Sequence, residues 1–119
     1  ICNRRKIMWA PGCGSLSEIS KAEELGAELV KIFPASEVGG PSFVKAVKGP
    51  CPWTNIMPTG GVDTTHENLK QWFDAGVTCV GMGSKLFSKE LIAKGDFENL
   101  TRKVKELTQT IQEIKSANL

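Results

Sequence analysis

Residues 29–35, which read Leu29-Val30-Lys31-Ile32-Phe33-Pro34-Ala35, place one lysine inside a short apolar run. A run of this length, rich in strand formers and ended by a proline, is typical of a buried β-strand. Side chains alternate along a strand, so Lys31 and Phe33 are predicted to share one face, with Val30 and Ile32 on the other. Because the run is nearly all apolar on both faces, we expect a strand of an interior parallel sheet.

Three further runs rich in strand formers follow the same pattern: Ile7–Ala10, Asn55–Pro58 and Thr78–Gly81. The centres of the four runs lie about 23 to 26 residues apart, which suits successive βα units. Strands that alternate with helices imply parallel pairing through right-handed crossovers. The predicted fold class is α/β, as either a small open sheet or half of an eight-stranded (β/α)8 TIM barrel.

Capping signals mark helices between these runs. Ser15-Leu16-Ser17-Glu18 predicts a helix that ends at Gly26, and Thr64-Thr65-His66-Glu67 predicts one that ends at Gly76. A shorter helix is expected over Pro41–Val47, because proline suits the first turn and a Gly-Pro pair follows.

The tail after Asp96 carries a single apolar stripe. Asp96 is a good N-cap, and the apolar residues beyond it recur at three- and four-residue steps. The stripe is Phe97, Leu100, Val104, Leu107, Ile111 and Ile114. We expect a terminal helix that packs on its own domain, with a partner-binding helix as the alternative.

Composition excludes several classes of protein. The 119 residues are 40% hydrophobic, and 15 Lys and Arg against 13 Asp and Glu give a net charge of +2. That balance does not favour a nucleic-acid partner. No apolar run approaches the roughly 18 residues of a membrane span, and residues 1–6 show no secretory signal pattern. A cytoplasmic protein is therefore expected.

The cysteines give no sign of a metal site or a disulfide framework. They form no CxxC pair, and the lone His66 has no cysteine nearby in the sequence. Reduced, mostly buried thiols are expected for Cys2, Cys13, Cys51 and Cys79.

Two glycine-containing turns follow the third and fourth runs, Thr59-Gly60-Gly61 and Gly81-Met82-Gly83-Ser84. Ligands of parallel α/β folds bind beyond the C-terminal ends of the strands. Glycines let the backbone approach an anion closely, and the Thr59 and Ser84 hydroxyls add further donors. The pattern favours a phosphate site, whereas the simpler alternative is two tight turns that need positive φ.

Lys31 admits two interpretations of equal weight. It either reaches solvent or a carboxylate at the strand end, or is held in a partly dry site. Desolvation disfavours the ammonium form of a lysine, and a neutral amine can attack a carbonyl to form an imine. His66 and Cys13 carry no comparable signal, because neither has an activating partner in the sequence.

Taken together, residues 29–35, Gly39-Gly40, Met57–Val62 and Val80–Ser84 resemble the 2-keto-3-deoxy-6-phosphogluconate / 4-hydroxy-2-oxoglutarate (KDPG/KHG) aldolase family. The resemblance runs from about Ile7 to Asp96, in the same order and at matching separations. It implies that residues 1–119 are the C-terminal half of a single (β/α)8 barrel, covering about strands five to eight and the terminal helices. The first half would then lie outside this sequence.

The resemblance also implies an activity and roles for individual residues. The family consists of class I, metal-free aldolases, which are lyases of carbohydrate metabolism that use a Schiff base, need no cofactor and are commonly homotrimers. Lys31 would correspond to the Schiff-base lysine and Phe33 to the aromatic residue of the pyruvate pocket. The substrate's distal phosphate would be bound by Thr59, Gly60, Gly61, Gly83 and Ser84. The family's general acid/base and carboxylate-binding residues lie in the first half, so this half alone is expected to be inactive or nearly so.

The expected reaction cleaves 2-keto-3-deoxy-6-phosphogluconate to pyruvate and glyceraldehyde 3-phosphate, and/or 4-hydroxy-2-oxoglutarate to pyruvate and glyoxylate. The glycine turns favour a phosphorylated 2-keto acid. Two alternatives are a non-catalytic phosphate-ligand-binding barrel module and a purely structural role for the half-barrel. A pyruvate-dependent imine at Lys31 would separate the aldolase from both.

Overall fold

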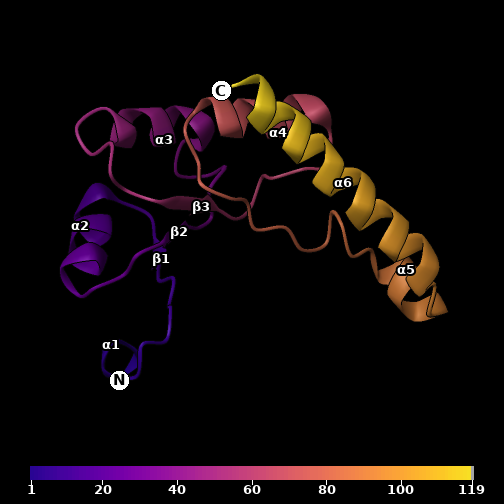
Figure 1. Cartoon of the computed structure of the whole chain (residues 1–119), viewed down its shortest axis with the longest axis horizontal. Helices are drawn as coiled ribbons and strands as arrows, with labels where there is room; N and C mark the ends of the chain where they lie inside the picture. The colour runs from indigo at the N-terminus through magenta and orange to yellow at the C-terminus, as the bar shows by residue number, and fades with distance from the viewer. Residues whose placement is uncertain (119) are drawn as a thin grey trace.

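The computed structural model describes residues 1–118. Short parallel strands alternate with helices along the chain, and two helices end it (Figure 1). The elements are α1 (Cys2–Arg5), β1 (Gly12–Cys13), α2 (Leu16–Glu24), β2 (Val30–Ile32), α3 (Gly40–Lys48), β3 (Ile56–Pro58), α4 (His66–Asp74), α5 (Lys89–Lys94) and α6 (Phe97–Ala117).

The sheet has the order β1-β2-β3 and is parallel throughout. Lys31 stands at its centre, with Gly12 of β1 as its partner on one side and Met57 of β3 on the other. This arrangement confirms the α/β class with a parallel sheet.

The prediction of a first strand over Ile7–Ala10 is wrong. Pairing with β2 begins later, where Lys31 N donates to the Pro11 carbonyl at 2.9 Å, and β1 covers only Gly12–Cys13. Ile7 and Met8 are both exposed. Apolar composition alone does not show where along an edge the ladder starts, and an edge strand has a partner on one side only.

The fourth predicted strand, Thr78–Gly81, runs beside β3 without forming a regular ladder. Thr78 N donates to Ile56 O at 2.9 Å, and Gly81 N donates to Pro58 O at 2.8 Å. The segment contributes one parallel bridge, between Thr59 and Gly81. The predicted neighbour relationship is therefore present, although the strand itself is not.

Helices cover one face of the sheet. Val30, Ile32 and Ile56 lie in one buried cluster with apolar residues of α2, α3 and α4, including the fully buried Trp72. Lys31 and Met57 alternate with these buried residues, and both are only half-buried. The face that carries Lys31 is therefore the less covered face of the sheet.

Most helix ends follow the predicted capping chemistry. Ser15 Oγ accepts a hydrogen bond from Glu18 N at 3.3 Å, as the first capping box requires. At α4 the cap is shifted by one residue: Thr65, not Thr64, accepts from Asn68 N. Helix α5 was not predicted; it begins after Ser88, whose hydroxyl accepts from Leu91 N.

The terminal helix α6 begins at the predicted cap, where Asp96 Oδ1 accepts from Asn99 N. Its C-terminal half packs on α4, with Ile114 buried. The N-terminal half of the stripe extends past the sheet toward α5 (Figure 1) and leaves Phe97 and Val104 exposed. The predicted packing on the sheet-bearing part of the chain is thus confirmed for the C-terminal half, whereas the N-terminal half contacts α5.

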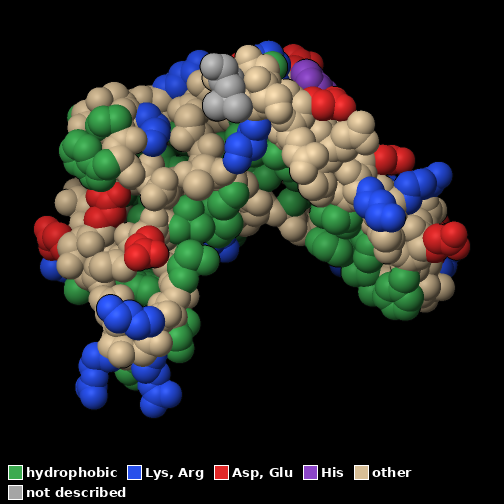
Figure 2. All heavy atoms as spheres, in the orientation of Figure 1, with side chains coloured by type: hydrophobic (Ala, Val, Ile, Leu, Met, Phe, Trp, Pro, Cys, Tyr) green, Lys and Arg blue, Asp and Glu red, His purple; other side chains and the backbone are tan. Residues whose placement is uncertain are grey.

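The molecule has the outline of an arch whose underside is hollowed and carries many of the apolar side chains visible in this view (Figure 2). Among the residues described, no helix is long and apolar enough to cross a membrane.

Candidate active site

Lys31 is the central residue of the central strand, and its surroundings leave its side chain accessible. Its partner Gly12 brings no side chain, and the space where a Cβ would stand there is open. The Lys31 ammonium lies over the Phe33 ring, 4.9 Å from the ring centroid. Phe33 itself is 54% exposed, on the same side of the strand.

Within residues 1–118, Lys31 Nζ makes neither a hydrogen bond nor an ion pair; the four ion pairs there involve other lysines. A structural lysine held by a carboxylate, one of the alternatives raised by the sequence, is thus absent from the part of the chain described. A half-buried amine over an aromatic ring, free of a carboxylate, can act as a nucleophile toward a carbonyl when it is neutral.

The turn after β3 presents backbone N–H groups. Gly60 and Gly61 both adopt positive φ, at 88° and 79°. The Thr59 carbonyl accepts from Ala35 N at 2.9 Å, and the Gly60 carbonyl accepts from Ser36 N at 3.2 Å. The Gly60 N–H faces Gly81 across the Thr59–Gly81 bridge, whereas no protein acceptor among residues 1–118 takes the N–H of Gly61 or Val62. Adjacent free N–H groups of this kind bind anions.

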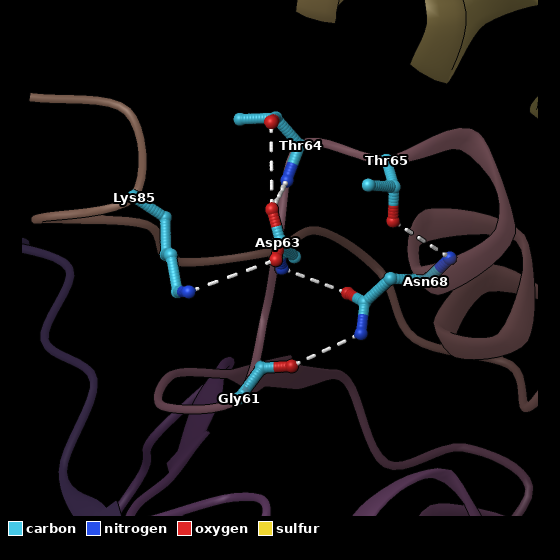
Figure 3. Close-up of polar contacts among 6 residues, drawn as sticks. All are labelled: Gly61, Asp63, Thr64, Thr65, Asn68 and Lys85. Atoms are coloured by element: carbon cyan, nitrogen blue, oxygen red, sulfur yellow. Dashed lines mark hydrogen bonds and ion pairs between the residues drawn. The ribbon is translucent and has the colours of Figure 1, made fainter.

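Asn68, in the first turn of α4, holds the far side of the same turn (Figure 3). Its Nδ2 donates to the Gly61 carbonyl at 3.2 Å, and its Oδ1 accepts from Asp63 N at 2.8 Å. One side chain therefore connects to the backbone on both sides of Val62.

The second glycine turn is more open. Gly83 and Ser84 are exposed, and Gly83 has no atom within 4 Å of the place where a Cβ would stand. The Gly83 carbonyl accepts from the amides of Leu86 and Phe87. Positive φ, expected at these turns, occurs at Gly60 and Gly61 and not at Gly81 or Gly83.

The two turns lie side by side. The Thr59–Gly81 bridge joins their first residues, and a Cβ at position 81 would lie 2.2 Å from Thr59 Oγ1. Farther out, Lys85 Nζ lies 3.8 Å from Asp63 Oδ2, as Figure 3 shows. The structure thus places Thr59, Gly60 and Gly61 beside the Gly81–Ser84 turn, at the C-terminal edge of the strand that carries Lys31.

Other ionisable groups near the strand ends do not resemble catalytic groups. Burial, with a smaller contribution from the Glu18 carboxylate, raises the pKa of the Cys13 thiol, the opposite of an activated nucleophile. Hydrogen bonds from Gly14 N and the Ser15 hydroxyl lower the pKa of Glu18. His66 is exposed at the start of α4. Residues 1–118 contain no group of three metal-ligating side chains.

A family model, described as KDPG and KHG aldolase, matches residues 1–103. The chain belongs to the KDPG and KHG aldolase family. A 2-dehydro-3-deoxy-6-phosphogalactonate aldolase of Escherichia coli is 45% identical over 78 residues, which are 65% of this chain and 37% of that protein. A 2-dehydro-3-deoxy-phosphogluconate aldolase of Pseudomonas aeruginosa is 36% identical over 104 residues, 87% of this chain and 46% of that protein.

Solved structures agree with this membership. A structure described as native KDPGal aligns with a TM-score of 0.74 and 32% identity, over 92% of this chain and 52% of that chain. The KDPG aldolase of Legionella pneumophila, with pyruvate captured as a covalent carbinolamine intermediate, aligns with a TM-score of 0.73 and 31% identity, over 82% and 47% of the two chains. The chain spans about half the length, or less, of these relatives.

Two residues of this aldolase-family chain escaped the sequence analysis. Ser36 packs against Gly61, and Asn68 bonds to the backbone around Val62. The Thr65-x-x-Asn68 spacing is a capping signal that could have directed attention to Asn68. Nothing in the sequence pattern marks Ser36, because its contact with Gly61 depends on how the two loops meet.

Proposed function

We propose that this chain supplies the imine-forming lysine and the phosphate site of a class I aldolase. Lys31 is the observation that carries the proposal: it is a half-buried amine at the centre of the sheet, free of a carboxylate partner. Family membership and a relative with pyruvate bound covalently support the same chemistry.

The fold behind this function is a (β/α)8 barrel to which residues 1–119 contribute about strands five to eight. The parallel sheet, helices on one of its faces and the hollowed apolar underside (Figure 2) support this proposal. Activity would then require the other half of the barrel. Homotrimeric assembly and a cytoplasmic location stay predictions.

In the proposed reaction, the lone pair of neutral Lys31 Nζ attacks the C2 carbonyl of a 2-keto acid, and the carbonyl oxygen leaves as water to give an iminium. A base outside this chain removes the C4 hydroxyl proton. The C3–C4 bond then breaks, its electron pair forms an enamine with the iminium, and C4 becomes an aldehyde. Protonation at C3 and hydrolysis by water release pyruvate and regenerate Lys31.

A phosphorylated 2-keto-3-deoxy sugar acid is the proposed substrate class, ahead of 4-hydroxy-2-oxoglutarate. The free N–H groups of Gly61 and Val62, in the turn that the Thr59–Gly81 bridge joins to the Gly81–Ser84 turn, support a distal phosphate. The substrate would span from the Lys31 amine to these turns.

Borohydride trapping tests the lysine. The protein produced from its complete coding sequence is incubated with pyruvate and borohydride, and the modified peptide is identified by mass spectrometry. Wild type and the control Lys45→Arg, at an exposed lysine of α3, should carry a reduced pyruvate adduct on the Lys31 peptide. Lys31→Arg, which keeps the charge and cannot form an imine, should carry none. Absence of the adduct from folded wild type would refute the aldolase and favour the phosphate-binding module.

A further inference from the structure

We propose that Asn68 is a positioning residue that orients the backbone N–H groups of the phosphate-binding turn; this inference rests on the proposed function. The side chain comes from α4, outside the turn, and bonds to the turn twice. Nδ2 donates to Gly61 O at 3.2 Å and Oδ1 accepts from Asp63 N at 2.8 Å. The backbone amide of Asn68 is separately bound to Thr65 Oγ1, which fixes the start of the helix.

The effect on the turn follows from peptide geometry. In a planar trans peptide, the N–H of one residue points opposite to the carbonyl of the residue before it. The Thr59 and Gly60 carbonyls are held by the amides of Ala35 and Ser36, so the N–H groups of Gly60 and Gly61 point away from that segment. The Gly60 N–H therefore faces Gly81 across the Thr59–Gly81 bridge, and the Gly61 N–H has no protein acceptor among residues 1–118.

Asn68 completes this arrangement at the next peptide. By holding the Gly61 carbonyl, it turns the N–H of Val62 away from α4. By accepting from Asp63 N, it occupies the following amide, so the row of free donors ends at Val62. Two consecutive N–H groups, those of Gly61 and Val62, thus have no protein acceptor among residues 1–118, while that of Gly60 faces Gly81.

A side-chain amide suits both tasks, because its nitrogen donates while its oxygen accepts in a different direction. Aspartate could still accept from Asp63 N, but its carboxylate has no donor for Gly61 O and adds negative charge beside an anion site. Leucine has similar bulk and makes neither bond. The role predicts that changes at Asn68 weaken binding of phosphate-bearing ligands and leave imine formation at Lys31 intact.

The test measures binding of inorganic phosphate by calorimetry and pyruvate trapping at Lys31 in parallel, on the protein from its complete coding sequence. The variants are Asn68→Asp and Asn68→Leu. Asn99→Leu is the matched control, because Asn99 holds the same position in the first turn of α6, where, among the residues described, it bonds through its side chain only to Asp96 and Arg102. We expect about a tenfold weaker phosphate affinity in both Asn68 variants and a trapping rate within about twofold of wild type.

Unchanged phosphate affinity in folded Asn68→Asp would overturn the proposal, as would the absence of phosphate binding by wild type. An equal loss of phosphate binding and of trapping would also overturn it, because that result indicates a general structural role. If Asn68→Leu fails to fold, Asn68→Asp still decides the question. Failure of the proposed function is recognised separately, as the absence of trapping in wild type.

Discussion

Gly61 and Ser36 approach so closely that a Cβ at position 61 would lie 2.5 Å from Cβ of Ser36. The two residues lie in the loops that follow β3 and β2, and the neighbouring Gly60 carbonyl accepts from Ser36 N. The absence of a side chain at position 61 therefore lets the Gly60-Gly61 turn rest against the loop that follows the Lys31 strand.

Gly61→Ala should lower the free energy of unfolding by about 2 to 4 kcal/mol, because alanine disfavours positive φ and its methyl group overlaps Ser36. Urea unfolding measures the loss. Gly83→Ala, at a glycine with open space and no positive φ, serves as the stability control and should cost less than about 1 kcal/mol. Equal losses in the two variants would show that the contact with Ser36 is unimportant.

Phe33→Ala should change ligand binding more than stability. The ring is more than half exposed, so its loss should lower the free energy of unfolding by less than about 1 kcal/mol. If the ring lines the pyruvate pocket, the pyruvate concentration needed for half-maximal trapping at Lys31 should rise several-fold. Phe97→Ala, at an exposed phenylalanine of α6, is the control and should leave trapping unaffected. An unchanged pyruvate dependence in Phe33→Ala would remove Phe33 from the site.

Trp72→Phe should lower the free energy of unfolding much less than the loss of a buried indole usually does. Trp72 is fully buried, and its Nε1 has no hydrogen-bond partner among residues 1–118. Replacing it with alanine should cost about 3 to 5 kcal/mol. Phenylalanine also removes the unsatisfied N–H, which offsets part of the lost packing, so the expected cost is about 1 kcal/mol. A cost for Trp72→Phe as large as that of the alanine variant, measured by urea unfolding, would contradict this.

Acid should weaken the start of α2 through Glu18. The Gly14 N–H, followed by the Ser15 hydroxyl, lowers the pKa of Glu18 in the folded chain. A carboxyl whose pKa is lower in the folded than in the unfolded state stabilises the fold above its unfolded pKa, and this stabilisation is lost as the pH falls through the folded pKa. Glu18→Gln should therefore lose stability less steeply than wild type as the pH falls below the ordinary glutamate pKa. Thermal unfolding across that range measures it, with Glu24→Gln, at an exposed residue of the same helix, as the control.

The sequence predicted β2, β3 and the long helices well, because local signals determine them. The apolar run around Lys31 and the Asp96 cap each depend on residues close together in the chain. The start of β1 and the exposure of apolar residues in the N-terminal half of α6 were not predicted. Both depend on which other segment of the fold packs against these residues, and the exposure of Ile7 and Phe97 shows that none covers them among residues 1–118.

The residues of the candidate site also fall into those that local sequence signals predict and those that they do not. Lys31 and the Gly60-Gly61 turn follow from strand alternation and turn chemistry. Asn68 and Ser36 do not, because their contacts join segments from different βα units. Identifying them required the spatial arrangement of the loops that follow β2 and β3.

Within residues 1–118, the sheet has an unpaired edge on each side, at β1 and at the segment beside β3 that contains Gly81. Exposed edges carry unpaired N–H and C=O groups that can template another strand. In isolation, residues 1–119 should therefore self-associate as concentration rises, through edge pairing and the apolar underside together. In the proposed barrel, the other half would cover both edges and the apolar underside, so the same contacts that complete the barrel would also protect these residues from aggregation.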